Sequence, residues 1–269
     1  MVRLLSFLIA VMLSAAALSA CSGRMQQRAD GQSAETPANS EAAQIDGQEY
    51  PGPADNQLTV QIESMEDEGS VFEYVVVTGL PEARIAESNY EGVDTAPDLL
   101  NQELETFFTW PMFSMDYPED GKTVTVTAKY AVVGKYLSVR AYDTEYAENA
   151  AHPVSGLRSH TRDLETGEYA GWLLDFIDVD AGLAEAVTSG KFVQVYPETP
   201  IDGAAEELAA QLNNSEEIYE IAGNFYLTET GVGIYITGRT HAEGYYWAFE
   251  APYDAIRPIL SEKLLSAIE

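Results

Sequence analysis

Residues 122–146, KTVTVTAKYAVVGKYLSVRAYDTEY, constrain the fold of this chain more than any other stretch. Two β-branched and aromatic runs, 122–133 and 135–146, meet at Gly134, and this pattern predicts a long β-hairpin. In the second run three apolar residues alternate with three more polar ones: Leu137, Val139 and Ala141 with Ser138, Arg140 and Tyr142. The alternation predicts a strand with one buried face.

Strands and helices follow one another in groups along the rest of the chain. Alternating or β-branched runs predict further strands, at 58–65, 72–80 and within 224–250. Helical spacing of apolar residues predicts three helices, at 96–108, 203–214 and 253–268. Pro258 lies within the last of these, so that helix is expected to start or kink there. Grouped strands with hairpin turns predict an α+β fold, an antiparallel sheet with helices packed on one face.

The stretch 148–177 contains two of the three histidines of the chain. Its pattern nevertheless indicates structural elements, strands and turns, and not a catalytic or metal-binding cluster. We predict a polar strand at 158–165 and a turn at 166–167. Residues 168–177 are then expected to run back along the strand and into the next helix. A helix at 181–189 follows. We expect Asp178 or Asp180 to be its N-cap and Gly190 to end it.

The first twenty residues have the pattern of an export signal. Arg3 precedes an apolar stretch at 4–17, and the sequence LSAC follows at 18–21 with the single cysteine of the chain. LSAC resembles the bacterial lipobox, whose cysteine is acylated and becomes the mature N-terminus. We therefore expect a lipoprotein signal peptide at 1–20 and lipidation at Cys21, with an ordinary signal peptide as the alternative. Two or three acyl chains would anchor the protein stably to a membrane.

Behind the anchor, residues 21–56 are rich in Ser, Ala, Gln, Gly, Pro and acidic residues, which predicts a flexible linker. We divide the remainder into an N-terminal α+β part at 57–147 and a second domain at 148–269, or one continuous fold made of both. No later segment approaches about 18 uninterrupted apolar residues. The predicted location is the cell envelope outside the cytoplasm, in the outer membrane if the organism has one.

The charge of the chain is strongly unbalanced. It has 44 acidic residues against 14 basic ones, a net charge of -30. Such a surface repels phosphate backbones, so we expect no nucleic acid partner. It attracts cations and basic proteins, and it also keeps a protein soluble, which is the alternative explanation of the acidity.

Few residue patterns suited to metal binding occur. A single cysteine leaves no disulfide, CxxC site or thiolate zinc cluster. The three histidines lack the close spacing of zinc ligands: His152, His160 and His241. Three aspartates lack the glycine and glutamate of an EF-hand loop, and helix capping accounts for them better: Asp175, Asp178 and Asp180. We expect neither a metal nor another cofactor.

Motifs of nucleophilic catalysis are missing as well. The chain has no G-x-S-x-G elbow and no glycine-rich phosphate loop. A carboxylate pair acting in a wall hydrolase is left open, because 44 acidic residues offer many pairs. The 16 Tyr, 9 Phe and 3 Trp residues offer a second possibility. In GNFYL at 223–227 and GYYWAF at 244–249, aromatics alternate, which suits either core packing or an exposed surface for carbohydrate or protein.

Several strings, in order, resemble one family. They are KYLSVRAYDTEYAENAAHP, RSHTRDLETGEYAGWLLDFI, NFYLTETGVGIYI and HAEGYYWAFEAPYDAI. Over about residues 95–260 they are similar to the C-terminal domain of RsiV-type anti-sigma factors, also found in some envelope polysaccharide deacetylases. By position, the resemblance implies turns or binding loops at three places: Ala151-His152-Pro153, Asp163 with Thr166 and Gly167, and Pro252-Tyr253. The chain departs from the family at Asn149-Ala150 and at Glu168.

The resemblance implies a function as well as a fold. In RsiV the domain senses lysozyme outside the cell. This chain offers neither the transmembrane helix nor the sigma-binding segment of RsiV, so we expect a lipid-anchored, non-catalytic binding module. Its expected ligand is a basic protein such as a muramidase, or a wall glycan. The alternatives are a wall hydrolase that uses a carboxylate pair and a structural envelope lipoprotein.

Overall fold

The computed structural model describes residues 49–50, 58–67, 69–79, 96–109, 122–148, 150–179, 182–214, 217–240, 242 and 244–269. The predicted signal peptide and lipidation site therefore lie outside the described residues, as do Asp180 and His241. Asp46–Glu269 form one compact unit. Within the described ranges, no helix has the length and apolar character that crossing a membrane requires.

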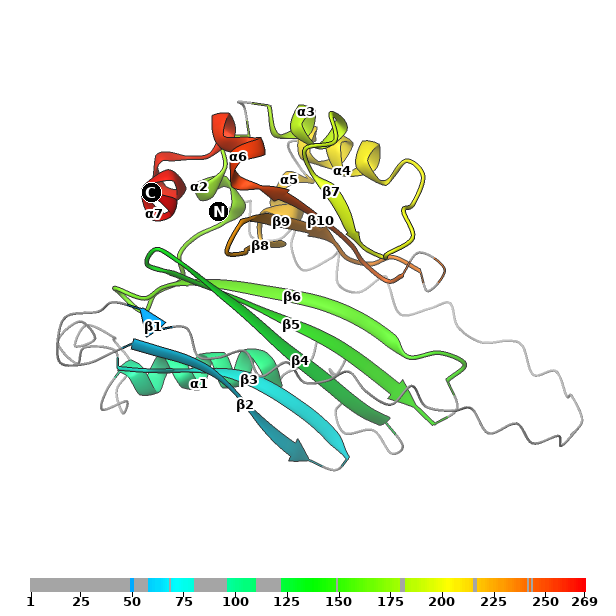
Figure 1. The fold of residues 1–269 in the computed structure, drawn as a ribbon. Helices are drawn as coiled ribbons and strands as arrows, with labels where there is room; N and C mark the ends of the chain where they lie inside the picture. Colours follow the sequence, from blue (N-terminus) through cyan, green and yellow to red (C-terminus); the bar gives the residue numbers. More distant parts are fainter. Residues whose placement is uncertain are drawn as a thin grey trace, which may run out of the picture. The chain divides into compact units, whose positions relative to one another are not determined.

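Six strands form the first sheet and follow one another across it in chain order (Figure 1). They are β1 (Glu49–Tyr50), β2 (Leu58–Asp67), β3 (Ser70–Thr78), β4 (Lys122–Val133), β5 (Tyr136–Ala147) and β6 (Val154–Asp163). β4 and β5 pair along their length, so the predicted hairpin is confirmed. Gly134 lies in the turn with a φ of 55°. A Cβ atom there would lie 2.6 Å from the carbonyl oxygen of Ala267, so the turn requires glycine.

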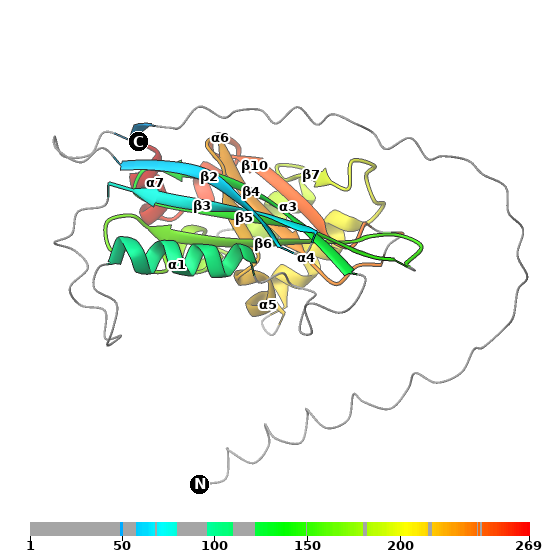
Figure 2. The same cartoon turned by 90° about the horizontal axis from the view of Figure 1, so that it is seen from below.

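Helix α1 (Ala96–Thr109) packs on one face of this sheet (Figure 2). In the sequence it lies between β3 and β4, the only parallel neighbours among the described strands of the sheet. A parallel pair needs a crossover connection, and α1 is part of it. Alternate residues of the strands and one side of α1 share a core that includes Leu104, Phe108, Val126, Leu137, Val139 and Ala141.

A buried ion pair fixes the end of α1 to the sheet. The guanidinium of Arg158 on β6 donates to both carboxylate oxygens of Asp143 on β5, at 2.7 and 2.8 Å. It also donates to the carbonyl oxygen of Phe107 in α1 and lies 4.8 Å from the centre of that ring. Because Asp143 is fully buried, removing its partner would leave a buried charge without compensation.

The second sheet has four strands in the order β7, β10, β9, β8 and lies on the opposite face of the first sheet from α1 (Figure 1). Its strands are β7 (Val193–Tyr196), β8 (Phe225–Leu227), β9 (Gly231–Ile236) and β10 (Trp247–Pro252). The helices that share its core are α2 (Leu173–Phe176), α3 (Leu183–Thr188), α4 (Ala204–Asn213), α5 (Ile218–Ala222), α6 (Tyr253–Ile256), the 3-10 helix η4 (Arg257–Ile259) and α7 (Glu262–Ile268).

Hydroxyl groups of the first sheet bind the edge strand of the second. The backbone N–H of Leu227 in β8 donates to Ser138 Oγ at 2.9 Å. Ser138 Oγ also lies 3.1 Å from Thr161 Oγ1, and both side chains are buried. Ser159 Oγ donates to the carbonyl oxygen of Phe225 at 2.5 Å. The predicted buried face of β5, with Leu137, Val139 and Ala141, is confirmed, and β8 covers the opposite face as well at Ser138.

The α+β class predicted from the sequence is confirmed, although two sheets are present where one was expected. Gly182, with a φ of 110°, occupies the N-cap of α3, so the prediction of Asp178 at that position is wrong. A backbone N–H of Asp178 instead donates to the carbonyl oxygen of Ile259. Around Pro258 the predicted C-terminal helix breaks into α6, η4 and α7.

Replacing the central hydroxyl tests the junction between the sheets. Ser138→Ala leaves the buried N–H of Leu227 without its acceptor, so we expect the free energy of unfolding to fall by about 1–3 kcal/mol. Urea unfolding followed by circular dichroism measures this change. Ser266→Ala, on an exposed helical position, is the matched control and should change stability by less than about 0.5 kcal/mol. Equal effects of the two variants would contradict a structural role for Ser138.

Candidate functional site

The residues carried over from the family resemblance lie in separate turns. Ala151, His152 and Pro153 are exposed and precede β6, whereas Thr166 and Gly167 follow it. A strand of 10 residues spans roughly 33 Å at about 3.3 Å per residue. The structure therefore does not bring these two turns together into one site.

The turn after β6 is held by its own polar side chains. Asp163 accepts a hydrogen bond from the backbone N–H of Glu165 at 2.8 Å and lies 2.7 Å from Lys135 Nζ. Thr166 Oγ1 accepts from the backbone N–H of Glu168 at 3.2 Å. Gly167 has a φ of 75°, a conformation that glycine adopts without strain. These contacts give the turn a structural role.

Pro252 and Tyr253 join β10 to α6. Pro252 is exposed, and the Tyr253 hydroxyl donates to the carbonyl oxygen of Thr228 at 2.8 Å. Burial raises the pKa of the Tyr253 phenol, so the hydroxyl stays protonated and continues to donate. Tyr253 thus fastens the turn between β8 and β9 to the start of α6.

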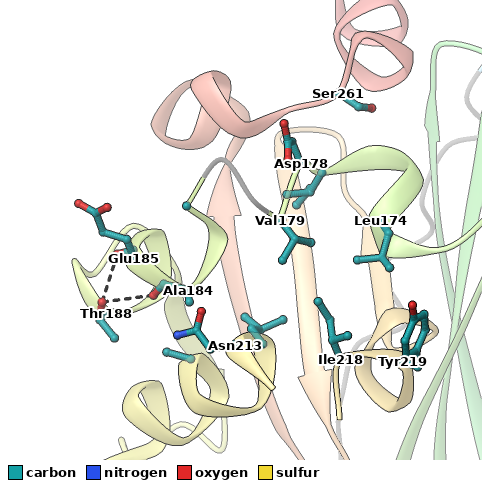
Figure 3. A pocket seen from close by; sticks show the side chains of 14 residues that line it. Leu174, Asp178, Val179, Ala184, Glu185, Thr188, Asn213, Ile218, Tyr219 and Ser261 are labelled. Carbon is teal, nitrogen blue, oxygen red and sulfur yellow. Dashed lines mark hydrogen bonds between the residues drawn. The ribbon is translucent and has the colours of Figure 1, made fainter. Parts of the chain in front are cut away.

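A groove of about 960 Å³ lies among α2, α3, α4 and α5 (Figure 3). Leu174, Val179 and Ile218 contribute apolar side chains to its lining. Tyr219 from α5 also lines it and has 70% of its surface exposed, while Leu174 has 37% exposed.

The groove is negatively charged. Among the described residues that line it, Asp178 and Glu185 carry carboxylates and none carries a cationic group. The Thr188 hydroxyl donates within α3, to the carbonyl oxygens of Ala184 and Glu185, at 3.2 and 3.3 Å (Figure 3). An apolar lining with carboxylates suits a ligand that presents apolar side chains beside cationic ones.

Further exposed aromatic residues lie close to the groove. Trp172, just before α2, has 51% of its surface exposed, and a Cβ atom added at Gly223 would lie 3.0 Å from its ring. Trp172 therefore lies against the end of α5, the helix that carries Tyr219. Its ring also meets that of Tyr169 edge to face, with centroids 5.9 Å apart.

The sequence pattern pointed to other aromatic residues. The aromatics of GNFYL and of YWAF at 246–249 are buried, namely Phe225, Tyr226, Tyr246, Trp247 and Phe249. The alternative of core packing is therefore confirmed for these strands. Trp172 stands in a stretch that we interpreted only as a return into a helix, and its exposure has no distinct signal in the sequence.

The residues considered for metal binding have other surroundings. In the described part of the chain, no group of three or more His, Cys, Asp or Glu side chains could hold a metal ion. Asp175 accepts a hydrogen bond from the backbone N–H of Trp172 at 2.7 Å and caps α2. The His160 ring lies between Phe107 and Tyr169, at centroid distances of 5.7 and 5.0 Å. Burial, and secondly the charge of Arg162, lower the pKa of His160 to about 4.

The comparisons with known proteins identify no family for this chain. No family model and no curated protein matches it. A crystal structure of a DUF3298 family protein from Pseudomonas aeruginosa PAO1 is similar, with a TM-score of 0.38 and 13% identity. The similarity covers 77% of this chain and 96% of that one. A similarity of this degree says nothing about function.

The burial of His160 predicts that the folded protein loses stability as the pH falls. Between about pH 6.5 and pH 4 the unfolded chain binds a proton on His160 that the folded protein does not. The free energy of unfolding therefore falls as the pH falls through this window, by up to about 1.4 kcal/mol per pH unit from this group. His160→Leu removes that contribution, so we expect the variant to lose less stability than the wild type between pH 7 and pH 4.5. Urea unfolding at both pH values measures it, and equal losses would refute the prediction.

Proposed function

We propose that this protein is a non-catalytic binding module of the cell envelope, anchored through Cys21, that binds a basic protein such as a muramidase in the groove among α2–α5. The observation that carries the proposal is the combination of exposed Leu174 and Tyr219 with the carboxylates of Asp178 and Glu185 in one groove. The two kinds of contact have different roles in binding.

The negative charge of the protein increases the rate of association with a basic partner. A net charge of -30 creates a long-range field that raises the encounter rate with a cationic protein at low ionic strength. At about 0.15 M salt this field is screened beyond about 8 Å, so only charges close to the interface still contribute. Asp178 and Glu185 are such charges, because they line the groove itself.

Apolar contact supplies the specificity. Tyr and Trp residues are enriched among the few positions that carry most of the binding energy of protein interfaces. Tyr219 and Trp172 have 70% and 51% of their surfaces exposed, so a partner would bury apolar area that now faces water. A basic protein without a complementary surface would gain the charge attraction alone.

Binding at increasing salt tests the proposal. Residues 21–269 with Cys21→Ser are immobilised, and lysozyme is compared with cytochrome c, a basic protein of unrelated fold. We expect lysozyme to stay bound at about 0.15 M salt while cytochrome c dissociates. If both dissociate together, the acidity acts only as a field and the proposed interface does not exist.

Two pairs of variants separate the apolar and charged contributions. Tyr219→Ala should weaken lysozyme binding by about 5- to 30-fold, while Tyr146→Ala, an exposed tyrosine of β5, should not. Glu185→Gln should slow association and reduce its salt dependence, and Glu66→Gln on β2 is its control. Unchanged binding in Tyr219→Ala would show that the partner docks elsewhere.

A further inference from the structure

A second, smaller cavity of about 240 Å³ opens where the two sheets meet, and it shares no lining residue with the groove. Its lining differs in character, since it contains four tyrosines and two cationic side chains: Tyr142, Tyr196, Tyr226, Tyr246, Lys129 and Arg140. The chain has 14 basic residues against 44 acidic ones, so two cations lining one cavity make it an unusual part of this surface.

The tyrosine rings of the lining pack against one another and against the two cationic side chains. The rings of Tyr196 on β7 and Tyr246 stack with centroids 4.1 Å apart and an angle of 15° between their planes. Across the cavity lining, the Arg140 guanidinium lies 4.5 Å from the centre of the Tyr226 ring. Burial raises the pKa values of Tyr226 and Tyr246, so both hydroxyls stay protonated, and that of Tyr226 already donates to Glu250.

The cavity has a local excess of positive charge. Glu250 accepts a hydrogen bond from the Tyr226 hydroxyl at 2.9 Å and lies 3.6 Å from Arg140 Nη1. Its single carboxylate stands against two cations, Arg140 and Lys129. Arg140 also donates to the Tyr142 hydroxyl at 3.3 Å, yet its buried Nε has no hydrogen-bond partner among the described residues. A buried donor without an acceptor costs free energy, which an incoming anionic oxygen or a water molecule would recover.

We propose that this cavity binds a single sugar ring that carries a carboxylate. The tyrosine hydroxyls of the lining, each of which can donate and accept a hydrogen bond, match the hydroxyl groups of a sugar ring. Lys129 and Arg140 supply charge-assisted hydrogen bonds to the carboxylate. The net positive charge of the lining matches one carboxylate, whereas a polyphosphate would meet the repulsion of a protein with a net charge of -30. This proposal does not depend on the groove or on its protein ligand.

The test compares three small probes on residues 21–269 with Cys21→Ser. Glucuronate and glucose differ by the carboxylate, and benzoate carries a carboxylate on a flat ring without hydroxyls. Titrations followed by NMR should show saturable binding of glucuronate, at least tenfold weaker binding of glucose, and weaker binding of benzoate. Equal binding of glucuronate and glucose, or no binding of either, overturns the proposal. Tighter binding of benzoate overturns the assignment to a sugar.

A charge variant locates the site. Lys129 is exposed, so Lys129→Gln should fold normally, and Lys191→Gln removes an exposed lysine outside the lining as a control. We expect Lys129→Gln to weaken glucuronate binding at least fivefold and to leave glucose binding unchanged. An equal effect of Lys191→Gln would assign the binding to the overall charge and overturn the site. Lysozyme binding should be the same in both variants, so failure of this proposal and failure of the proposed function are distinguishable.

Discussion

The hydrogen bonds that Ser138 and Ser159 make with the backbone of β8 fix the position of the second sheet on the first. An edge strand presents N–H and C=O groups that need partners once they are buried. Here the hydroxyls of β5 and β6 supply them, and the second sheet therefore lies across the first. The cavity between the sheets exists because of this crossing, and the groove among α2–α5 belongs to the elements that the second sheet carries.

The sequence predicted local pairing well and the contact between sheets poorly. The hairpin at 122–146 was evident because alternation and a glycine turn depend only on neighbouring residues. The burial of Ser138 was not evident from the sequence, because a polar row on a strand has the same pattern whether it meets water or another backbone. Only the position of β8, 89 residues further along the chain, distinguishes the two cases. The prediction of an aspartate as the N-cap of α3 was wrong for a different reason. Gly182 takes this position with a φ of 110°, a conformation that glycine adopts without strain.

The candidate sites were harder still to predict. Two of the three turns suggested by resemblance lie at opposite ends of β6, and the later one is held by its own side-chain hydrogen bonds. By contrast, Leu174, Glu185 and Tyr219 meet in the groove only because short helices pack around a common core. No spacing in the sequence marks them, because each is an ordinary residue of an amphipathic helix. Composition did indicate the acidic charge of the chain, and two carboxylates, those of Asp178 and Glu185, line the groove.

The two proposed sites respond to the net charge of -30 in opposite ways. The field attracts a basic partner to the groove, so salt weakens that encounter. The same field repels an anionic sugar at long range, and salt reduces the repulsion before the ligand reaches the cavity. Inside the cavity Arg140 is largely buried, so its contact with a carboxylate is screened much less than the long-range field. Ionic strength thus acts on the two sites with opposite sign, which a single acidic surface binding both ligands could not do.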